Sequence, residues 1–186
     1  QIDILVNNAG ITQPRRTIEI SAGDYDAVLD VSLRGGRKIR MVTAHATVRD
    51  LELLGELIAA GKKVLVDPKR TELSAYQGAF LLTPNRKELT DATGLPCETD
   101  EEAAIAIRRA QEMCGANILL TRSEKGMSFY PLGGSPLHLA TVAQDVFDVS
   151  GAGDTVVAVL AASIAAGMPF QDGMRMANHA AGIVVS

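Results

Sequence analysis

The chain has 186 residues, of which 47% are hydrophobic and 22% charged, and its formal net charge is −4. This length and composition suit a single folded domain, residues 1–186, and exclude a disordered chain. The acidic net charge, with no long run of Lys or Arg, gives no reason to expect a nucleic-acid partner. The Ala-rich run Thr155–Met168 is too short for a membrane span, so no membrane partner is expected either. The two cysteines, Cys97 and Cys114, match no metal-ligand spacing and predict reduced thiols in a cytoplasmic protein.

Strands and helices are predicted to alternate along most of the chain. In chain order we expect a strand at 2–6, a helix at 17–33, a strand at 38–43, a helix at 48–60, strands at 63–66 and 79–82, helices at 85–92 and 100–114, a strand at 117–121, a strand pair at 126–130 and 137–141, and helices at 151–166 and 170–185. Thr99 is the expected N-cap of the helix at 100–114. This order predicts a three-layer α/β fold, with a mainly parallel sheet, helices on both faces and an antiparallel hairpin at one edge.

A glycine-rich turn lies at the predicted start of the helix at 151–166. Gly151, Ala152 and Gly153 are small, so backbone N–H groups can approach a ligand closely, and the helix dipole favours an anion at this position. The next residue, Asp154, could accept a proton from a hydroxyl group that attacks a phosphoryl group. From the residues alone, a plain turn with an acidic first helical turn remains the alternative.

The segment 148–155 (DVSGAGDT) closely resembles the signature of the ribokinase-like carbohydrate kinases. Four other segments resemble, in the same order, the branch of that family that phosphorylates heptose 7-phosphate for ADP-heptose synthesis: 66–69 (VDPK), 81–88 (LLTPNRKE), 120–127 (LTRSEKGM) and 136–139 (PLHL). The resemblance covers about 48–186 as a ribokinase-like C-terminal portion. It implies ATP and Mg²⁺ as cofactors, and a nucleotide and a phosphorylated sugar as partners.

The same resemblance implies a set of site residues. They are Asp154 as the catalytic base, Gly151, Ala152 and Gly153 as an anion hole, Asn85, Glu88 and Lys69 for magnesium and phosphate placement, and Thr121, Ser123, Gly126 and Asn178 for the nucleotide. Ser123 departs from the family's T-x-G-x-x-G motif, which has glycine at that position. Two alternatives stay open. Asn85 and Glu88 could form a capping box at a helix start, and Arg122 and Lys125 could be solvated loop charges.

Residues 1–35 resemble a different family. The segment 3–11 (DILVNNAGI) resembles the N-N-A-G segment of the short-chain dehydrogenases, and 24–35 (DYDAVLDVSLRG) resembles the helix that follows it there. The sequence contains neither the glycine-rich dinucleotide fingerprint nor a Tyr-x-x-x-Lys pair, so dehydrogenase activity is not expected.

We interpret the chain as a chimera, engineered or selected for foldability, in which a dehydrogenase-like βα segment precedes part of a carbohydrate kinase. Apolar residues at both ends, 2–6 and 180–186, are typical of a chain cut from within larger sequences. The kinase family's sugar pocket and lid have no counterpart in the sequence, so we expect a residual ATP and phosphate site with little or no catalysis. Two alternatives remain. One is an active ATP-dependent heptose-7-phosphate kinase, completed by homodimer formation, and the other is a non-catalytic α/β interaction module.

Overall fold

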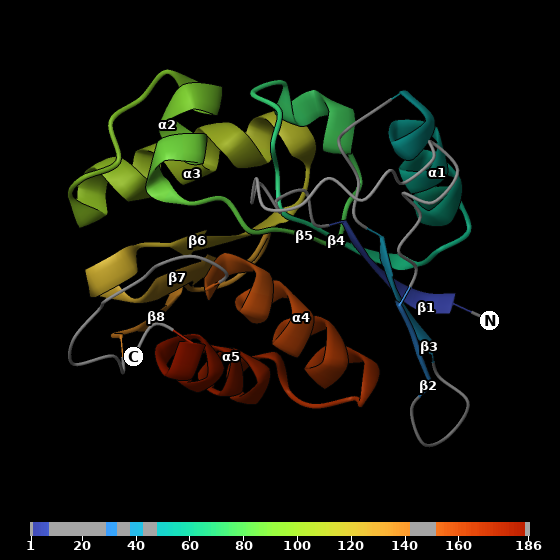
Figure 1. The fold of residues 1–186 in the computed structure, drawn as a ribbon. Helices are drawn as coiled ribbons and strands as arrows, with labels where there is room; N and C mark the ends of the chain where they lie inside the picture. Colours follow the sequence, from blue (N-terminus) through green and yellow to red (C-terminus); the bar gives the residue numbers. More distant parts are fainter. Residues whose placement is uncertain (1, 8–28, 33–37, 43–47, 142–151, 185–186) are drawn as a thin grey trace, which may run out of the picture.

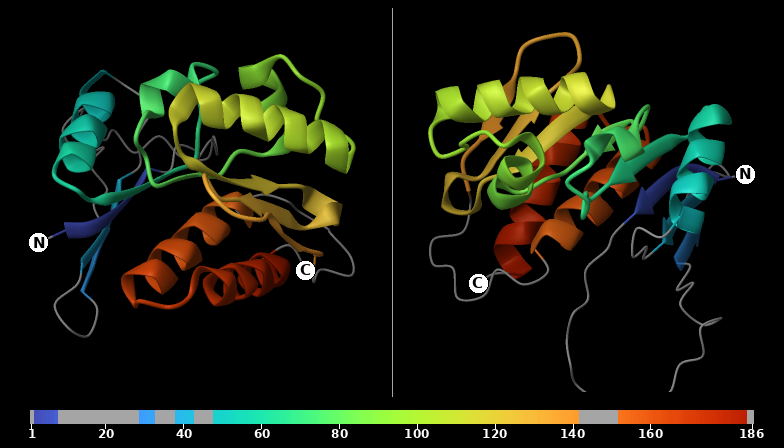
Figure 2. Two further views of the ribbon diagram at one scale, coloured as in Figure 1. Left: turned by 180° about the vertical axis from the view of Figure 1, so that it is seen from behind. Right: turned by 90° about the horizontal axis from the view of Figure 1, so that it is seen from above.

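The computed structural model describes residues 2–7, 29–32, 38–42, 48–141 and 152–184. In these residues a single eight-stranded sheet lies between two layers of helices (Figure 1, Figure 2). The strands are β1 (Ile2–Asn7), β2 (Leu29–Ser32), β3 (Lys38–Val42), β4 (Lys63–Val66), β5 (Leu81–Leu82), β6 (Asn117–Thr121), β7 (Met127–Tyr130) and β8 (Leu137–Leu139). The helices are α1 (Val48–Ala59), α2 (Arg86–Thr93), α3 (Asp100–Cys114), α4 (Ala152–Ala165) and α5 (Phe170–Val184), with short 3-10 helices η1 (Leu73–Tyr76) and η2 (Ser123–Lys125).

The strand order is β2-β3-β1-β4-β5-β6-β7-β8. Strands β3, β1, β4, β5 and β6 run parallel, whereas β2, β7 and β8 pair antiparallel with their neighbours. The predicted α/β fold, with its mainly parallel sheet and antiparallel hairpin edge, is therefore confirmed. Strand β1 pairs with both β3 and β4, so the N-terminal segment lies inside the sheet rather than at its edge.

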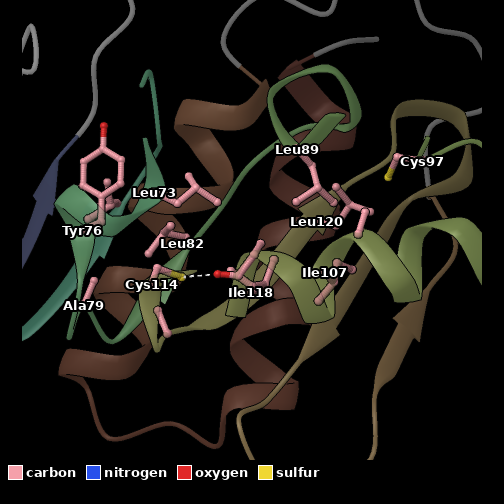
Figure 3. Packing of buried hydrophobic residues seen from close by; sticks show 14 of the residues in the cluster. Leu73, Tyr76, Ala79, Leu82, Leu89, Cys97, Ile107, Cys114, Ile118 and Leu120 are labelled. Atoms are coloured by element: carbon pink, nitrogen blue, oxygen red, sulfur yellow. Dashed lines mark hydrogen bonds between the residues drawn. The ribbon is translucent and has the colours of Figure 1, made fainter. Parts of the chain in front are cut away.

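Alternate side chains of the central strands face opposite helical layers, as the two-residue period of a strand requires. Val64 and Val66 of β4 belong to a core cluster shared with α1, α2 and α3 (Figure 3). Leu65, between them, belongs to a second cluster shared with α4 and α5. All three side chains are fully buried, and each such burial stabilises the fold by about 1.5–3 kcal/mol. The continuous apolar run of β4 thus positions one helical layer on each face of the sheet.

Local signals explain where α3 begins and ends. Thr99 is its N-cap, as predicted. The Thr99 hydroxyl accepts a hydrogen bond from the Glu102 backbone N–H at 3.1 Å, and the Glu102 carboxylate accepts one from the Thr99 N–H at 3.0 Å. This reciprocal capping box satisfies two N–H groups that the helix itself cannot pair. Gly115, with a φ of 60°, ends the helix in the left-handed conformation.

The helix predicted at 17–33 is wrong where the structure describes it. Leu29–Ser32 forms β2, which pairs antiparallel with β3, with Val31 opposite Ile39. Leu29 and Val31 alternate with Asp30 and Ser32, a pattern of period two that pairing with β3 favours over a helix. The rest of that predicted helix lies outside the described residues.

Cys97 and Cys114 are free and buried, as the reduced-thiol prediction requires. The thiol of Cys114 donates a hydrogen bond to the Ala110 carbonyl at 3.0 Å, within the core shown in Figure 3. Of the helices that the structure describes, none has both the length and the apolar character needed to cross a membrane.

Candidate active site

A cleft of about 700 Å³ lies where β5 and β6 lead into their loops, between the starts of α2 and α4 and the side of α5. Its lining residues are Asn85, Arg86, Lys87, Thr90, Asp91, Glu98, Thr121, Ser123, Gly126, Met127, Thr141, Ala152, Gly153, Val156, Asn178, Ala181 and Gly182. In open α/β sheets, the crevice at the carboxyl ends of parallel strands is the usual ligand site.

Most of the predicted site residues meet in this cleft. Asn85, Thr121, Ser123, Gly126, Ala152, Gly153 and Asn178 line it, although they span more than ninety positions of the chain. Asp154, Glu88 and Lys69 are not among its lining residues, and Gly151 lies outside the described residues. The structure therefore brings together three separate segments and the last helix, as one binding site would require.

The start of α4 forms one wall of the cleft. Ala152 is the first residue of the helix, and Asp154 lies half-buried in its first turn. N–H groups in a first helical turn have no partner within the helix, and the dipole favours an anion beside them. Gly153 is exposed, and no heavy atom of the described residues lies within 4 Å of the point where its Cβ would stand. Nothing described therefore crowds a ligand out of this position.

The start of α2 lies against the loop that follows β6. Asn85 and Thr121 form a parallel β-bridge, and the Thr121 N–H donates to the Pro84 carbonyl at 3.0 Å. The Asn85 side chain accepts a hydrogen bond from the Glu88 N–H at 2.8 Å, and the Glu88 carboxylate accepts one from the Asn85 N–H at 2.9 Å. The capping box that the sequence left open as an alternative is thus present, and it fixes both side chains at the helix start.

Lys69 forms ion pairs with two carboxylates, those of Asp67 and of the capping-box residue Glu88. Its ammonium nitrogen lies 2.9 Å from Asp67 Oδ2 and 2.8 Å from Glu88 Oε1. Glu88 therefore uses one oxygen for Lys69 and the other for the Asn85 N–H. Burial raises the pKa of Asp67 from 3.8 to about 6, because Lys69 only partly offsets the loss of hydration, and the charges of Glu88 and Asp154 add to the rise.

We expect the raised pKa of Asp67 to make the protein less stable as the pH rises. Between pH 4 and 6 the folded state holds a proton on Asp67 that the unfolded state has released. The contribution of Asp67 to the free energy of unfolding should therefore be largest below about pH 4 and fall by up to about 3 kcal/mol as the pH rises through 6. Urea unfolding at a series of pH values checks this.

The Asp67→Asn variant should lose this part of the pH dependence. Asp91→Asn is the matched control, since it removes an exposed carboxylate that pairs with Lys87, and the slope between pH 4 and 6 should persist in this variant. An undiminished slope in Asp67→Asn would show that another group titrates.

The loop of residues 121–126 closes on itself through its backbone; we call it the nucleotide loop, after the nucleotide motif that its sequence resembles. The Arg122 N–H donates to the Gly126 carbonyl at 2.8 Å, and the Gly126 N–H donates to the Ser123 carbonyl at 2.9 Å. Ser123 has a φ of 50°, in the left-handed region that glycine occupies most easily. Serine at this position therefore carries backbone strain that the glycine of the family motif would avoid.

Replacing Ser123 with glycine should raise the free energy of unfolding by up to about 1 kcal/mol, because it removes the left-handed strain. Chemical denaturation measures the difference. Ser74→Gly is the control: Ser74 lies in η1 without a positive φ, so the same substitution there should lower stability. Equal losses in both variants would contradict the strain at Ser123.

Two residues anchor the other side of the cleft. Gly126 has a φ of 79°, and a Cβ built there would lie 2.1 Å from the Leu139 carbonyl oxygen. The Asn178 side chain, buried on α5, donates a hydrogen bond to the Ala140 carbonyl at 2.7 Å. Both residues thus hold the chain just after β8 against the cleft, and the amide nitrogen of Asn178 already has a partner.

Comparison with known proteins identifies the family. The family model for pfkB family carbohydrate kinases matches residues 32–186. The chain belongs to the pfkB family of carbohydrate kinases. The bifunctional protein HldE of Rhodospirillum rubrum is 51% identical over 143 residues, which cover 74% of this chain and 29% of that protein. HldE of Geobacter sulfurreducens is 48% identical over 138 residues, covering 72% of this chain and 28% of the relative. The chain thus spans less than a third of these relatives' length.

Solved structures of the family share the fold. A ribokinase from Arabidopsis thaliana, complexed with ribose and ATP, matches with a TM-score of 0.68 and 26% identity over 74% of this chain and 46% of that one. A ribokinase from Cryptococcus neoformans in complex with ADP matches with a TM-score of 0.63 and 23% identity, over 77% of this chain and 56% of that one. The predicted ribokinase-like fold is confirmed.

Sequence reasoning missed several lining residues of this pfkB-family cleft. Arg86 and Lys87 lie within the N-x-x-E motif, at a helix start where a phosphate would be expected, so their position was a usable signal. The Arg86 guanidinium contacts Glu124 at 3.1 Å and Glu98 at 3.5 Å. These pairs connect α2, the segment before α3 and the nucleotide loop along one rim of the cleft.

The alternative of solvated loop charges is wrong for Arg122. Its side chain is buried, and Arg122 Nη2 lies 2.6 Å from Asp100 Oδ1. Lys125 is exposed, but its ammonium group donates to the Glu98 carbonyl at 2.7 Å. Both side chains therefore tie the nucleotide loop to the segment that begins α3.

The chemistry of the cleft fits a polyphosphate with its magnesium ion. Backbone N–H groups at the start of α4 and the cations Arg86 and Lys87 would attract the phosphates, and small side chains leave room for them. The described residues contain no group of three or more His, Cys, Asp or Glu that could hold a metal by itself. In kinases Mg²⁺ is held by one or two carboxylates together with the substrate phosphates, so such a group is not needed.

Proposed function

We propose that the chain retains the ATP and phosphate site of a carbohydrate kinase of the heptose-7-phosphate branch, with little or no turnover. The observation that supports this most is the meeting in one cleft of residues from the N-x-x-E segment, the nucleotide loop, the start of α4 and α5. A pfkB-family match over residues 32–186 and HldE relatives at about 50% identity support the substrate class.

In this proposal the first turn of α4 performs the phosphate chemistry. The N–H groups of Ala152 and Gly153, with Gly151 before them, hold the γ-phosphate and stabilise the charge that develops during transfer. The sugar hydroxyl oxygen forms a bond to the γ-phosphorus, the bond to the ADP oxygen breaks, and Asp154 takes the hydroxyl proton. Asn85, Glu88 and Lys69 serve to place the magnesium and the phosphates.

The nucleotide loop and α5 would hold the nucleoside part of ATP. Thr121, Ser123 and Gly126 line the cleft on one side and Asn178 on the other. Asn178 donates its amide hydrogen to Ala140, so we assign it to shaping the pocket beside the base rather than to reading the base through that hydrogen. Mg²⁺ supplies charge neutralisation of the phosphates when it is bound with the nucleotide.

The expectation of little turnover follows from residues 1–35. The family match begins at residue 32, close to the end of the segment that resembles the short-chain dehydrogenases. Strand β1 continues the sheet between β3 and β4, which is how a βα segment from another α/β family would join a kinase portion. In this proposal residues 1–35 supply no sugar contacts, so the acceptor hydroxyl is not positioned, and positioning is a large part of phosphoryl-transfer catalysis.

ADP release with Mg-ATP in the presence and absence of heptose 7-phosphate tests the proposal. We expect little or no sugar-dependent release. Any release that occurs should fall by a factor of about 10²–10⁴ in Asp154→Asn, with nucleotide binding retained, because the base is lost. Asp172→Asn is the control: Asp172 lies in the first turn of α5 and pairs with Arg175. Fast sugar-dependent release would favour the alternative of an active kinase, whose missing sugar contacts come from a second copy of the chain.

A further inference from the structure

Arg122, a residue of the nucleotide loop, carries a buried guanidinium. Its side chain is 5% exposed, and Arg122 Nη2 lies 2.6 Å from Asp100 Oδ1 in the first turn of α3. Within the described part of the chain, Arg122 Nε and Nη2 have no acceptor in hydrogen-bonding geometry. The charge of Asp100 is therefore the main compensation that the described residues offer this guanidinium. Removing the partner of a buried cation strongly destabilises the folded state, because the remaining charge is buried without compensation.

The backbone of Arg122 lies within the nucleotide loop itself. Its N–H donates to the Gly126 carbonyl at 2.8 Å, and its carbonyl accepts from the Lys125 N–H at 3.0 Å. The residues on either side, Thr121 and Ser123, line the cleft, whereas Arg122 does not. The Arg122 side chain is therefore buried outside the cleft, whereas its two neighbours in the loop line the cleft.

We propose that the Arg122–Asp100 ion pair is the positioning device of the nucleotide loop. This rests on the proposed function, since it assigns the loop a nucleotide to bind. If Asp100 loses its charge, the Arg122 guanidinium must move toward water to recover hydration. Because Arg122 lies between two lining residues, its movement displaces them from the cleft. Asp100 itself is exposed in the first turn of α3 and does not line the cleft, so in this inference it acts through Arg122 and without contact to the ligand.

The charge pattern around Asp100 supports this assignment. Arg122 holds the pKa of the Asp100 carboxyl below its usual value, mainly through its direct contact, with smaller contributions from His138 and Lys125. Asp100 therefore stays ionised across the neutral range. Lys125 attaches the far end of the loop to the Glu98 carbonyl at 2.7 Å, two residues before Asp100. The loop is thus tied at two points to the segment that begins α3.

The test compares Asp100→Asn with Glu101→Gln. Both remove one negative charge from the first turn of α3, and both positions are exposed, so helix-dipole effects match. Isothermal titration with Mg²⁺ and a non-hydrolysable ATP analogue gives the affinity. Hydrogen exchange of the Lys125 and Gly126 amides, whose acceptors lie within the loop, reports loop opening without any ligand. Asp100→Glu keeps the charge and should retain most of the affinity.

We expect Asp100→Asn to bind the analogue about tenfold more weakly and to exchange both amides faster, since it frees the loop. Glu101→Gln should match the unsubstituted chain in both measurements. A folded Asp100→Asn variant with unchanged affinity and unchanged exchange would overturn the inference. Faster exchange with unchanged affinity would also overturn it, since the ion pair would then support only the fold. Failure of the unsubstituted chain to bind the analogue would instead refute the proposed function, independently of the exchange result.

Discussion

Replacing Gly126 with alanine is expected to lower the free energy of unfolding by at least about 3 kcal/mol, enough to unfold a marginal domain. Two physical causes add. The backbone of Gly126, with φ 79° and ψ −128°, is a conformation that side chains rarely adopt. A Cβ would also lie 2.1 Å from the Leu139 carbonyl oxygen and 2.6 Å from the Thr141 nitrogen, and these backbone atoms cannot move aside without breaking the strand edge.

Urea denaturation measures this effect, and Gly133→Ala provides the control. Gly133 lies in the turn between β7 and β8 without a positive φ, and no heavy atom of the described chain lies within 4 Å of its would-be Cβ. Its substitution should change stability by less than about 0.5 kcal/mol. Equal unfolding midpoints for the two variants would show that the lack of space for a Cβ at Gly126 does not affect the stability of the fold.

The second large effect is expected at Gly153, where a substitution should weaken ligand binding and leave the stability of the fold intact. Gly153→Leu introduces a side chain into α4 at a position with open space on the described side, so the fold should be retained. The same side chain would occupy the cleft beside the first helical turn, where the phosphates are proposed to lie. We expect the affinity for Mg-ATP to fall at least about 100-fold, which corresponds to about 2.7 kcal/mol.

Gly55→Leu is the matched control for this substitution. Gly55 is an exposed glycine within α1, and again no described heavy atom lies within 4 Å of its would-be Cβ. Both variants gain helix propensity by a similar amount, so their thermal unfolding should be alike. Calorimetric titration then separates them, because nucleotide binding should persist in Gly55→Leu. Unchanged affinity of Gly153→Leu for Mg-ATP would show that the start of α4 is not part of the nucleotide site.

The fold could be predicted wherever the signals are local. The bounds predicted for α3 agree with the structure because Thr99, Glu102 and Gly115 each act within one helical turn. Leu29–Ser32 was predicted as helix because its strand character depends on a partner, β3, that no local pattern specifies. The place of β1 between β3 and β4 was not predictable for the same reason, since strand order depends on contacts between distant segments.

The candidate site was predicted through motifs and not through geometry. The N-x-x-E segment, the nucleotide loop and the start of α4 each carry a recognisable pattern, and residues of all three line the cleft. Arg122 was misjudged because a charged residue in a loop is usually solvated, and its burial depends on Asp100 more than twenty positions earlier. Arg86 was not singled out because its rim contacts, Glu98 and Glu124, come from elsewhere in the chain.

Calorimetric titration of the unsubstituted chain with Mg-ATP tests the central claim most directly. If the cleft is a retained nucleotide site, titration should give saturable binding to one site, and the melting temperature should rise with the ATP concentration. At 100 times the dissociation constant the added stability should be about 2.7 kcal/mol. A chain that is folded by circular dichroism, yet gives no binding heat and no shift of the melting temperature at millimolar Mg-ATP, would contradict the account.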